Sequence, residues 1–280
     1  MRIGPGDDCA VLSSGLALTT DALVQGVHFD SRLTPEDVGF KAVAVSVSDL
    51  GSMGATPAWM TLALCLPRDV DADWVQRFAR GLGEAARTYN VSLVGGDTTR
   101  SPGPILVSVT MGGPLVADPL TRSGGRAGHD LWITGSLGIA AEGWLNATPG
   151  APSLEALRRP APPLAFALGL AERSLASAAM DLSDGLLTDL RRLCAASGVG
   201  AEVDPDRVPG SSDDTARLAG GDDYELLFTA PPDQRSQIQA LAQRHGTDVT
   251  LIGALTQNTD VRLIGRPWPA PAWRHFGGDP

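Results

Sequence analysis

The chain has 280 residues, of which 43% are hydrophobic and 19% charged, as expected of a soluble globular protein with one large domain or two modest ones. Acidic residues outnumber basic ones by 32 to 22, and the net charge of −10 disfavours a nucleic-acid-binding surface. Three cysteines without a CxxC pair indicate neither a disulfide framework nor a zinc site. No signal-peptide pattern and no run of about 18 apolar residues occurs, so we expect a cytoplasmic protein without a membrane segment.

The first half of the chain alternates strand-like and helix-like segments. Residues 9–12 and 16–20 have the pattern of a β-hairpin. A helix is predicted from Pro35 to about Met53, because Thr34 can cap it and acids occupy its first turn. Further elements are expected in this order: a strand at 59–66, a helix at 71–89, a strand at 91–94, a loop at 95–100 and a strand at 105–111.

The second half repeats this alternation after a stretch rich in Gly, Arg and Ser at 118–128, which indicates a domain boundary. We expect domains at 1–117 and 118–280. Predicted strands lie at 130–134, 178–180, 201–203, 224–229 and 249–252, with helices at 138–145, 164–176, 186–194 and 233–245 and a Pro-rich link at 149–163. The predicted fold class is α+β, with a mixed sheet and helices in the N-terminal domain and a sheet plus helices in the C-terminal domain.

The segment GGDTTR at 95–100 is the first candidate for a phosphate site. Its two glycines let the backbone pass close to a bulky anion. Asp97 cannot hold a phosphate itself, but it can hold a Mg²⁺ ion that does. Gly-Gly-Asp is also an ordinary turn, so the argument depends on the other acidic segments of the chain.

Asp49 is the most informative of these acids, because it follows a segment of small and apolar residues that reads as buried. A buried carboxylate without compensation is costly, so it is expected to be paired, protonated or bound to a metal. A salt bridge to Lys41 is the alternative, but that residue lies about two helical turns away. Metal binding is the preferred interpretation.

Other acids lie beside Gly, Ser or Thr at expected element ends. Asp8 could be a surface turn residue, and Thr19-Thr20-Asp21 could be a strand-end turn or ligands of a hard cation. Asp184 could simply cap the following helix, but a cap does not explain Asp181.

Three more positions have both a functional and an ordinary interpretation. His28 follows a turn and is as readily a packed residue as a ligand. Arg122 is a candidate for a phosphate clamp or a solvated loop residue. Asp222, in a second Gly-Gly-Asp segment, could again belong only to a turn.

Taken together, the motifs resemble those of the thiamine-monophosphate kinase family, within the aminoimidazole-ribonucleotide synthetase superfamily. The likeness covers nearly the whole chain, and TTD…GVHF with GGDTTR is specific to the kinases. The motifs are GDDCAV (6–11), TTDALVQGVHF (19–29), KAVAVSVSDLGSMGATP (41–57), GGDTTR (95–100), TRSGGRAGHDLWITG (121–135), MDLSDGL (180–186) and GGDDYELLFT (220–229).

The resemblance implies ATP-dependent phosphorylation of thiamine monophosphate to thiamine diphosphate, several Mg²⁺ ions and a homodimer built through the N-terminal domains. It implies metal ligands at Asp8, Thr19, Thr20, Asp21, Asp49, Asp97, Asp181 and Asp184. It implies ATP contacts at Gly96, Asp97, Arg122 and Ser183, and substrate contacts at His28, Asp222 and a C-terminal tryptophan, Trp273 or Trp268. The family usually has Glu where this chain has Asp222.

Phosphoryl transfer needs positioning and charge neutralisation more than covalent help. The sequence has no Walker A motif, so Mg²⁺ ions held by acids are expected to offset the repulsion between two phosphorylated substrates. Direct in-line attack is the hypothesis. The alternatives are another ATP-dependent enzyme of the superfamily, such as a cyclase or a selenophosphate-forming relative, or a non-catalytic nucleotide-binding subunit.

Overall fold

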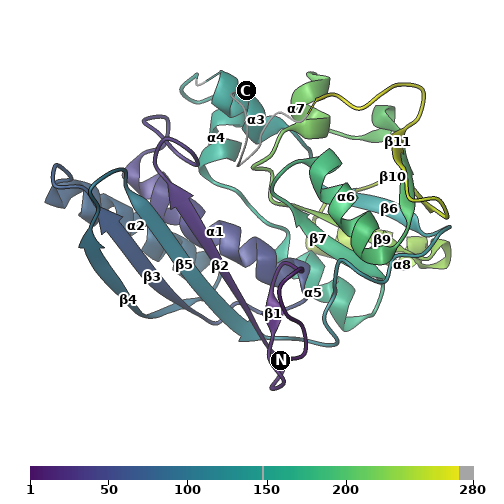
Figure 1. The fold of residues 1–280 in the computed structure, drawn as a ribbon, viewed down its shortest axis with the longest axis horizontal. Helices are drawn as coiled ribbons and strands as arrows, with labels where there is room; N and C mark the ends of the chain where they lie inside the picture. Colours follow the sequence, from purple (N-terminus) through teal and green to yellow (C-terminus); the bar gives the residue numbers. More distant parts are fainter. Residues whose placement is uncertain (147, 271–280) are drawn as a thin grey trace.

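The computed structural model describes residues 1–146 and 148–270, which form two sheets joined side by side (Figure 1). The N-terminal sheet has the order β1-β2-β5-β3-β4, and the C-terminal sheet has the order β11-β8-β10-β6-β9-β7. The mixed α/β architecture with two sheet-and-helix halves confirms the predicted fold class. Within the described ranges, no helix is both long and apolar enough to cross a bilayer.

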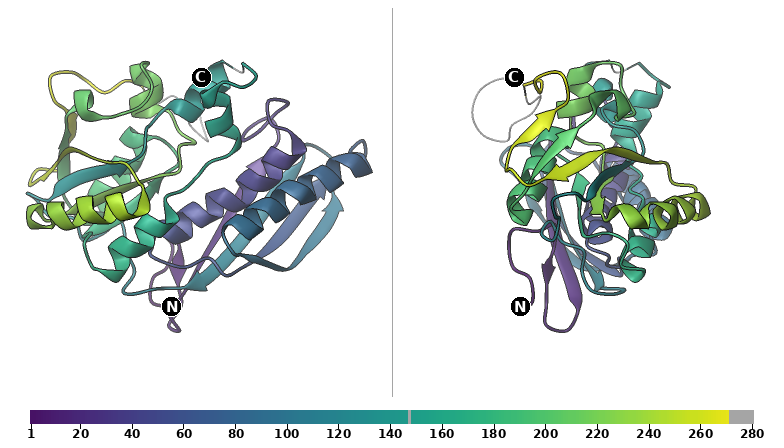
Figure 2. Two further views of the ribbon diagram at one scale, coloured as in Figure 1. Left: turned by 180° about the vertical axis from the view of Figure 1, so that it is seen from behind. Right: turned by 90° about the vertical axis from the view of Figure 1, so that its right-hand side faces the viewer.

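The N-terminal sheet is covered by helices on one face only. Helices α1 (Pro35–Ser52) and α2 (Ala72–Thr88) both lie behind the sheet in Figure 1 and in front of it in the reversed view of Figure 2. No helix of the described chain covers the opposite face (Figure 1). The strands are β1 (Ala10–Val11), β2 (Leu16–Val24), β3 (Trp59–Leu66), β4 (Ser92–Arg100) and β5 (Leu106–Pro114).

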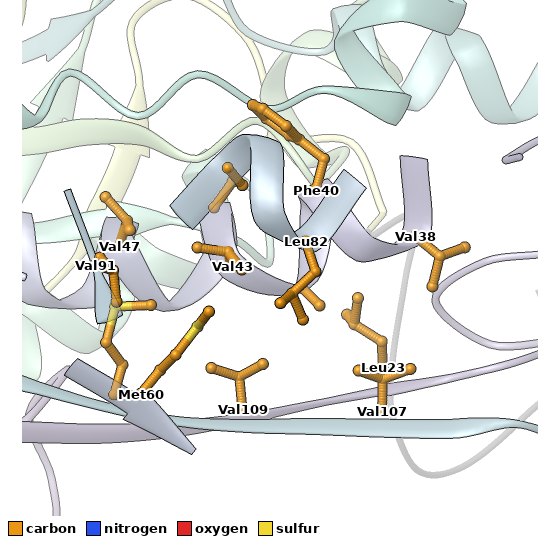
Figure 3. Packing of buried hydrophobic residues seen from close by; sticks show 14 of the residues in the cluster. Leu23, Val38, Phe40, Val43, Val47, Met60, Leu82, Val91, Val107 and Val109 are labelled. Carbon is orange, nitrogen blue, oxygen red and sulfur yellow. The ribbon is translucent and has the colours of Figure 1, made fainter. Parts of the chain in front are cut away.

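Helix α1 begins as the sequence predicted. Thr34 and Asp37 form a capping box, in which the Thr34 hydroxyl accepts from the Asp37 amide at 3.3 Å and the Asp37 carboxylate accepts from the Thr34 amide at 2.9 Å. Val43 and Val47 of α1 point toward Met60 and Val109 of the sheet (Figure 3). This apolar packing fixes α1 against the strands.

Two glycines let α1 and α2 approach backbone to backbone. A Cβ atom at Gly81 would overlap the carbonyl oxygen of Glu36, and one at Gly39 would overlap the carbonyl oxygen of Phe78. Neither position has room for a larger residue, so the two helices cross in one fixed arrangement.

Two strands are longer than predicted. The expected loop at 95–100 is part of β4, which pairs with β3 in parallel and shifts register between Met60 and Thr61. A Cβ at Gly96 would overlap the carbonyl oxygen of Leu62, so the glycine allows close strand pairing here rather than a turn. The expected end of β2 at residues 19–21 is also wrong, because β2 continues to Val24.

The C-terminal sheet is covered on both faces. In β6 (Asp130–Thr134), Leu131 and Ile133 pack in one apolar cluster with α6 (Leu186–Ser197), whereas Trp132 packs in another with α5 (Leu164–Glu172) and α8 (Arg235–His245). Such alternation is expected of a strand between two helical layers. The other strands are β7 (Ala178–Leu182), β8 (Gly200–Val203), β9 (Glu225–Ala230), β10 (Val249–Thr256) and β11 (Val261–Leu263).

Three short α-helices of the described chain lie in its second half, and two of them, α3 (Ile139–Leu145) and α4 (Pro152–Arg158), pack against the core of the first half. Helix α3 was predicted, but α4 lies within the segment that we expected to be a Pro-rich link. Its Pro152 occupies the first helical turn, where no backbone donor is needed, so the prolines do not exclude a helix there. Helix α7 (Asp214–Ala219) was not predicted either.

Candidate active site

A cavity of about 730 Å³ lies between the two halves of the molecule. The N-terminal half contributes β2, α1 and the turn after β2, and the C-terminal half contributes α3 and the loops after β7 and before β9. Its lining includes Thr20, Asp21, His28, Asp30, Arg32, Asp49, Trp144, Asp181, Ser183, Asp184, Asp213, Asp222 and Tyr224. A cleft between domains with many convergent polar groups is the usual form of a small-molecule site.

Three carboxylates that line this cavity, of which Asp181 is buried and the other two half-buried, receive hydrogen bonds from hydroxyl groups. Ser46 donates to Asp21 at 2.7 Å, and Thr19 donates to Asp49 at 2.5 Å. Ser48 donates to Asp181 at 2.8 Å, which joins α1 to β7 of the other half. These three acids and Asp8 form the acid cluster.

Burial is the main reason that Asp21, Asp49 and Asp181 resist ionisation. It raises the pKa of Asp49 and of Asp181 well above the usual range, and the neighbouring carboxylates raise both further. Burial also raises the pKa of Asp21. Within residues 1–146 and 148–270, none of these three has an ion pair with Lys, Arg or His.

Asp8 is the one member of the acid cluster that has a cationic partner among the described residues. The Arg122 side chain donates twice to Asp8 Oδ1, from Nε at 2.9 Å and Nη2 at 2.5 Å, and Ser52 donates to the other oxygen. The Arg122 amide donates to Asp7 at 3.0 Å. The predicted ATP-binding arginine thus contacts a predicted metal ligand, with both side chains at the junction between the halves.

The residues present fit a hard divalent cation. Carboxylate and hydroxyl oxygens are the ligands that Mg²⁺ prefers, and a cation would relieve the repulsion that raises the pKa values. Yet in the described part of the chain no three His, Cys, Asp or Glu side chains are arranged as a ready metal cage. Arg122 and the hydroxyl groups occupy several carboxylate oxygens, so these side chains must reorient to bind a cation.

The loop after β7 holds a second acidic group. Asp184 pairs with Arg192 at 2.5 Å, and its amide donates to Asp189 at 2.9 Å. Burial, followed by the charge of Asp184, raises the pKa of Asp189 to about 7. The suggestion that Asp184 caps α6 is wrong, because Gly185 occupies the N-cap position and has no side chain to accept a hydrogen bond.

The far end of the cavity is organised by Asp222. Its Oδ2 atom accepts from Lys41 Nζ at 2.6 Å and from Trp144 Nε1 at 3.0 Å. The alternative pairing of Lys41 with Asp49 is therefore wrong. Sequence reasoning missed the role of Lys41 and Trp144, although one basic residue within the apolar part of α1 was a signal.

His28 and Arg32 lie on the turn between β2 and α1. The His28 ring accepts from the Val24 amide at 3.1 Å through Nδ1, so the imidazole lies close to its own turn. The Arg32 guanidinium lies over the Trp144 ring, 5.1 Å from its centroid. Both residues line the cavity.

Two predicted residues, Gly96 and Asp97, are not near the acid cluster within one chain. Asp97 is paired with Ala63, which is paired with Ser108, which is paired with Ala22. Three strand spacings, about 14 Å in total, therefore separate β4 from β2. Ala22 is adjacent to Asp21 and points to the opposite face, so Asp97 lies on the helix-free face.

The remaining predicted residues divide as follows. Thr19 lies inside beside Asp49, whereas Thr20 is exposed and contacts Thr110 at 3.0 Å. Ser183 lines the cavity beside Asp184. Trp273 lies outside the described residues, and Trp268 instead donates to the carbonyl of Val261 at 3.1 Å.

Comparisons with known proteins agree with this two-part organisation. The family "AIR synthase related protein, N-terminal domain" matches residues 6–115, and "AIR synthase related protein, C-terminal domain" matches residues 126–266. The thiamine-monophosphate kinase of Salmonella typhimurium is 39% identical over 286 residues, covering 93% of this chain and 86% of its own.

Two solved structures are also similar over nearly the whole chain. The thiamine-monophosphate kinase of Stenotrophomonas maltophilia is 39% identical, with a TM-score of 0.83 and coverage of 95% of this chain and 91% of that one. The structure of "AaThiL complexed with AMPPCP and TMP" is 32% identical, with a TM-score of 0.85 and coverage of 97% and 91%.

Proposed function

Since the chain belongs to the thiamine-monophosphate kinase family of AIR-synthase-related proteins, we propose that it transfers the γ-phosphoryl group of ATP directly to thiamine monophosphate. The related AaThiL structure is a complex with TMP and with AMPPCP, an ATP analogue. That complex supports a site that takes a nucleotide and thiamine monophosphate together.

The acid cluster is the observation that carries this proposal. Its carboxylates have hydroxyl partners at an interdomain cavity, and two polyanionic substrates could not approach them without intervening cations. We assign Mg²⁺ ligation to Asp8, Thr19, Thr20, Asp21, Asp49, Asp97, Asp181 and Asp184. When bound, Mg²⁺ would supply charge neutralisation and orientation of the phosphate oxygens. Gly96, Asp97, Arg122 and Ser183 would contact ATP.

The proposed transfer is a single in-line displacement. An oxygen of the acceptor phosphate forms a bond to the γ-phosphorus, and the bond to the β-bridging oxygen breaks with its electron pair leaving on ADP. The acceptor is already ionised at neutral pH, so no strong general base is needed. Burial raises the pKa of Cys9 well above its usual range, which makes this thiol a poor nucleophile for a covalent intermediate.

The position of Asp97 supports a homodimer. The whole of β4 is exposed and forms a sheet edge, and Leu93 and Val94 are 49% and 63% exposed. Unpaired, partly apolar edges of this kind are usually covered. We propose that residues 1–117 dimerise through the helix-free face, with residues 118–280 as the C-terminal domain, and that Asp97 of one copy joins the acid cluster of the other.

The first test is incubation of the purified protein with ATP, Mg²⁺ and thiamine monophosphate. Thiamine diphosphate and ADP are expected in equal amounts, with no phosphorylated protein after rapid quenching. No thiamine diphosphate at saturating substrates would reject the kinase proposal, and a phosphoprotein that turns over would reject only the direct transfer.

Co-expression of Asp49→Asn and Asp97→Asn chains tests the shared site. Each variant alone is expected to be nearly inactive. Half of the randomly paired dimers would be mixed, and each mixed dimer would hold one intact site, so about a quarter of wild-type activity should return. If Asp97 acts within its own chain, no activity returns.

A further inference from the structure

Lys41 is a buried cation that does not reach the cavity. Its side chain is 0% exposed, and it does not belong to the cavity lining. Its ammonium group donates to Asp222 at 2.6 Å and to the carbonyl of Leu157 at 3.3 Å. Because a buried ammonium is retained only with a close partner, the pairing fixes both groups.

Asp222 does reach the cavity, with 18% of its side chain exposed. Its backbone has a φ of 72°, which is rare for a residue other than glycine. Its Oδ2 atom is held from α1 by Lys41 and from α3 by Trp144. Three chain segments thus cooperate to place one carboxylate at the cavity wall.

The wall at this end suits a ligand with cationic and N–H donor groups. Asp30, Asp213 and Asp222 line the cavity, and Arg32, which pairs with Asp30 at 2.6 Å, is the arginine stacked on the Trp144 ring. A flat cationic ring could take the place of that guanidinium on the indole face. Thiamine has such a ring, the thiazolium, and an aminopyrimidine whose exocyclic amine donates hydrogen bonds.

We propose that Lys41 is a positioning residue for substrate recognition: through Asp222 it holds an ionised acceptor for the aminopyrimidine amine, with Trp144 as the second support. This inference rests on the proposed kinase function and names the residue behind its substrate contact. Lys41 cannot touch the substrate, so its effect passes through Asp222. A salt bridge that only joins the two halves is the competing explanation.

The test compares Lys41→Met, Asp222→Asn and the double variant. Each single variant should raise the KM for thiamine monophosphate about tenfold or more, with the KM for ATP within about twofold. The double variant should be no worse than Asp222→Asn, because Lys41 acts through that carboxylate. Loss of both charges also removes the unpaired ion, so the double variant should recover much of any lost Tm.

Arg235→Met is the matched control. Arg235 pairs with the buried Asp130 at 2.5 Å, and neither residue lines the cavity. This variant should lower the Tm and leave both KM values unchanged. Calorimetric binding of thiamine monophosphate without ATP supplies a readout independent of turnover, and Lys41→Met should weaken it to the same degree as its KM.

The possible results distinguish a failure of the positioning role of Lys41 from a failure of the proposed function. If wild-type protein turns over normally and Lys41→Met keeps its KM for thiamine monophosphate, the positioning role is wrong. The same conclusion follows if both KM values rise together and recover with the Tm in the double variant. If the wild-type protein neither binds nor phosphorylates thiamine monophosphate, the proposed function itself fails, and the role of Lys41 fails with it.

Discussion

The two sheets of the molecule differ in how much of their surface the chain itself covers. Every residue of β6 and β7 is buried between helical layers, whereas every residue of β4 is exposed. In the C-terminal sheet, α5 and α8 cover one face and α6 the other. In the N-terminal sheet, α1 and α2 cover a single face (Figure 2). The C-terminal sheet is covered on both faces within one chain, whereas the described chain leaves one face of the N-terminal sheet without helices.

The largest expected effect concerns the covered side of the N-terminal sheet, where Asp49 lies. Asp49→Asn should reduce turnover about 1000-fold or more, because it removes an anionic ligand from the proposed cation site. Steady-state formation of thiamine diphosphate measures the effect. Asp206→Asn, at a 91% exposed side chain, is the control and should keep wild-type turnover. Near-normal turnover of Asp49→Asn at saturating Mg²⁺ would contradict the assignment.

The next prediction compares one residue from each sheet. Phe228 of β9 is fully buried, and Phe228→Ala should lower the free energy of unfolding by about 3–5 kcal/mol. Val94→Ser on β4 should change it by less than about 0.5 kcal/mol when the chains are too dilute to associate. Urea unfolding measures both effects. Sedimentation should show that Val94→Ser, and not Phe228→Ala, weakens self-association. A large loss of monomer stability in Val94→Ser would mean that β4 is covered by its own chain.

A third prediction uses Glu225, at the start of β9 in the C-terminal sheet. Burial raises its pKa to about 7 from an ordinary value of 4.5. Folding therefore favours the protonated form, so this contribution to stability is complete below pH 4.5 and is lost as the pH rises through 7. The loss is at most about 3 kcal/mol, because the side chain is only partly shielded from solvent.

Glu225→Gln should flatten this dependence. Its free energy of unfolding should fall less than that of the wild-type protein between about pH 5 and pH 8, when both are measured by urea titration. Parallel curves for the two proteins would show that Glu225 is not the group responsible.

The smallest predicted effect is a gain in stability of Asp49→Asn, the variant that is expected to lose activity. Without Mg²⁺, Asp49→Asn should be more stable than the wild-type protein by about 1–2 kcal/mol near pH 8, because it relieves repulsion among buried carboxylates. Mg²⁺ should raise the Tm of the wild-type protein more than that of the variant. Thermal unfolding with and without Mg²⁺ measures both, and equal shifts would argue against cation binding by Asp49.

Local signals predicted much of the fold and part of the site. The start of α1 followed from Thr34 and Pro35. The apolar segment before Asp49 is buried as expected, whereas Asp49 itself is partly exposed at the cavity. The strand at 95–100 was missed, because two adjacent glycines are typical of a turn and only the close approach of β3 explains them. The physical cause lies in a neighbouring strand that the local sequence does not reveal.

The sequence also did not reveal which residues from distant parts of the chain would form ion pairs. Lys41 and Asp222 are far apart in sequence, and they meet because α1 packs beside the loop before β9. Arg122 and Asp8 meet in the same way at the junction between the halves. The sequence offered only Asp49 as a partner for Lys41, and the spacing of about two helical turns already made that pair the less favoured interpretation; tertiary packing supplies Asp222 instead.

Helix α1, held by its tight crossing with α2 at Gly39 and Gly81, sets a fixed distance between two parts of the proposed site. Lys41 and Asp49 stand about 12 Å apart along its axis, at the helical rise per residue. The helix itself fixes that interval, and the close crossing at the two glycines keeps α1 from sliding against α2. Under the proposed assignment, the helical rise of α1 sets the distance between the substrate's ring and the phosphate that accepts the transfer. We expect analogues with a shorter or longer spacer between ring and phosphate to be poorer substrates.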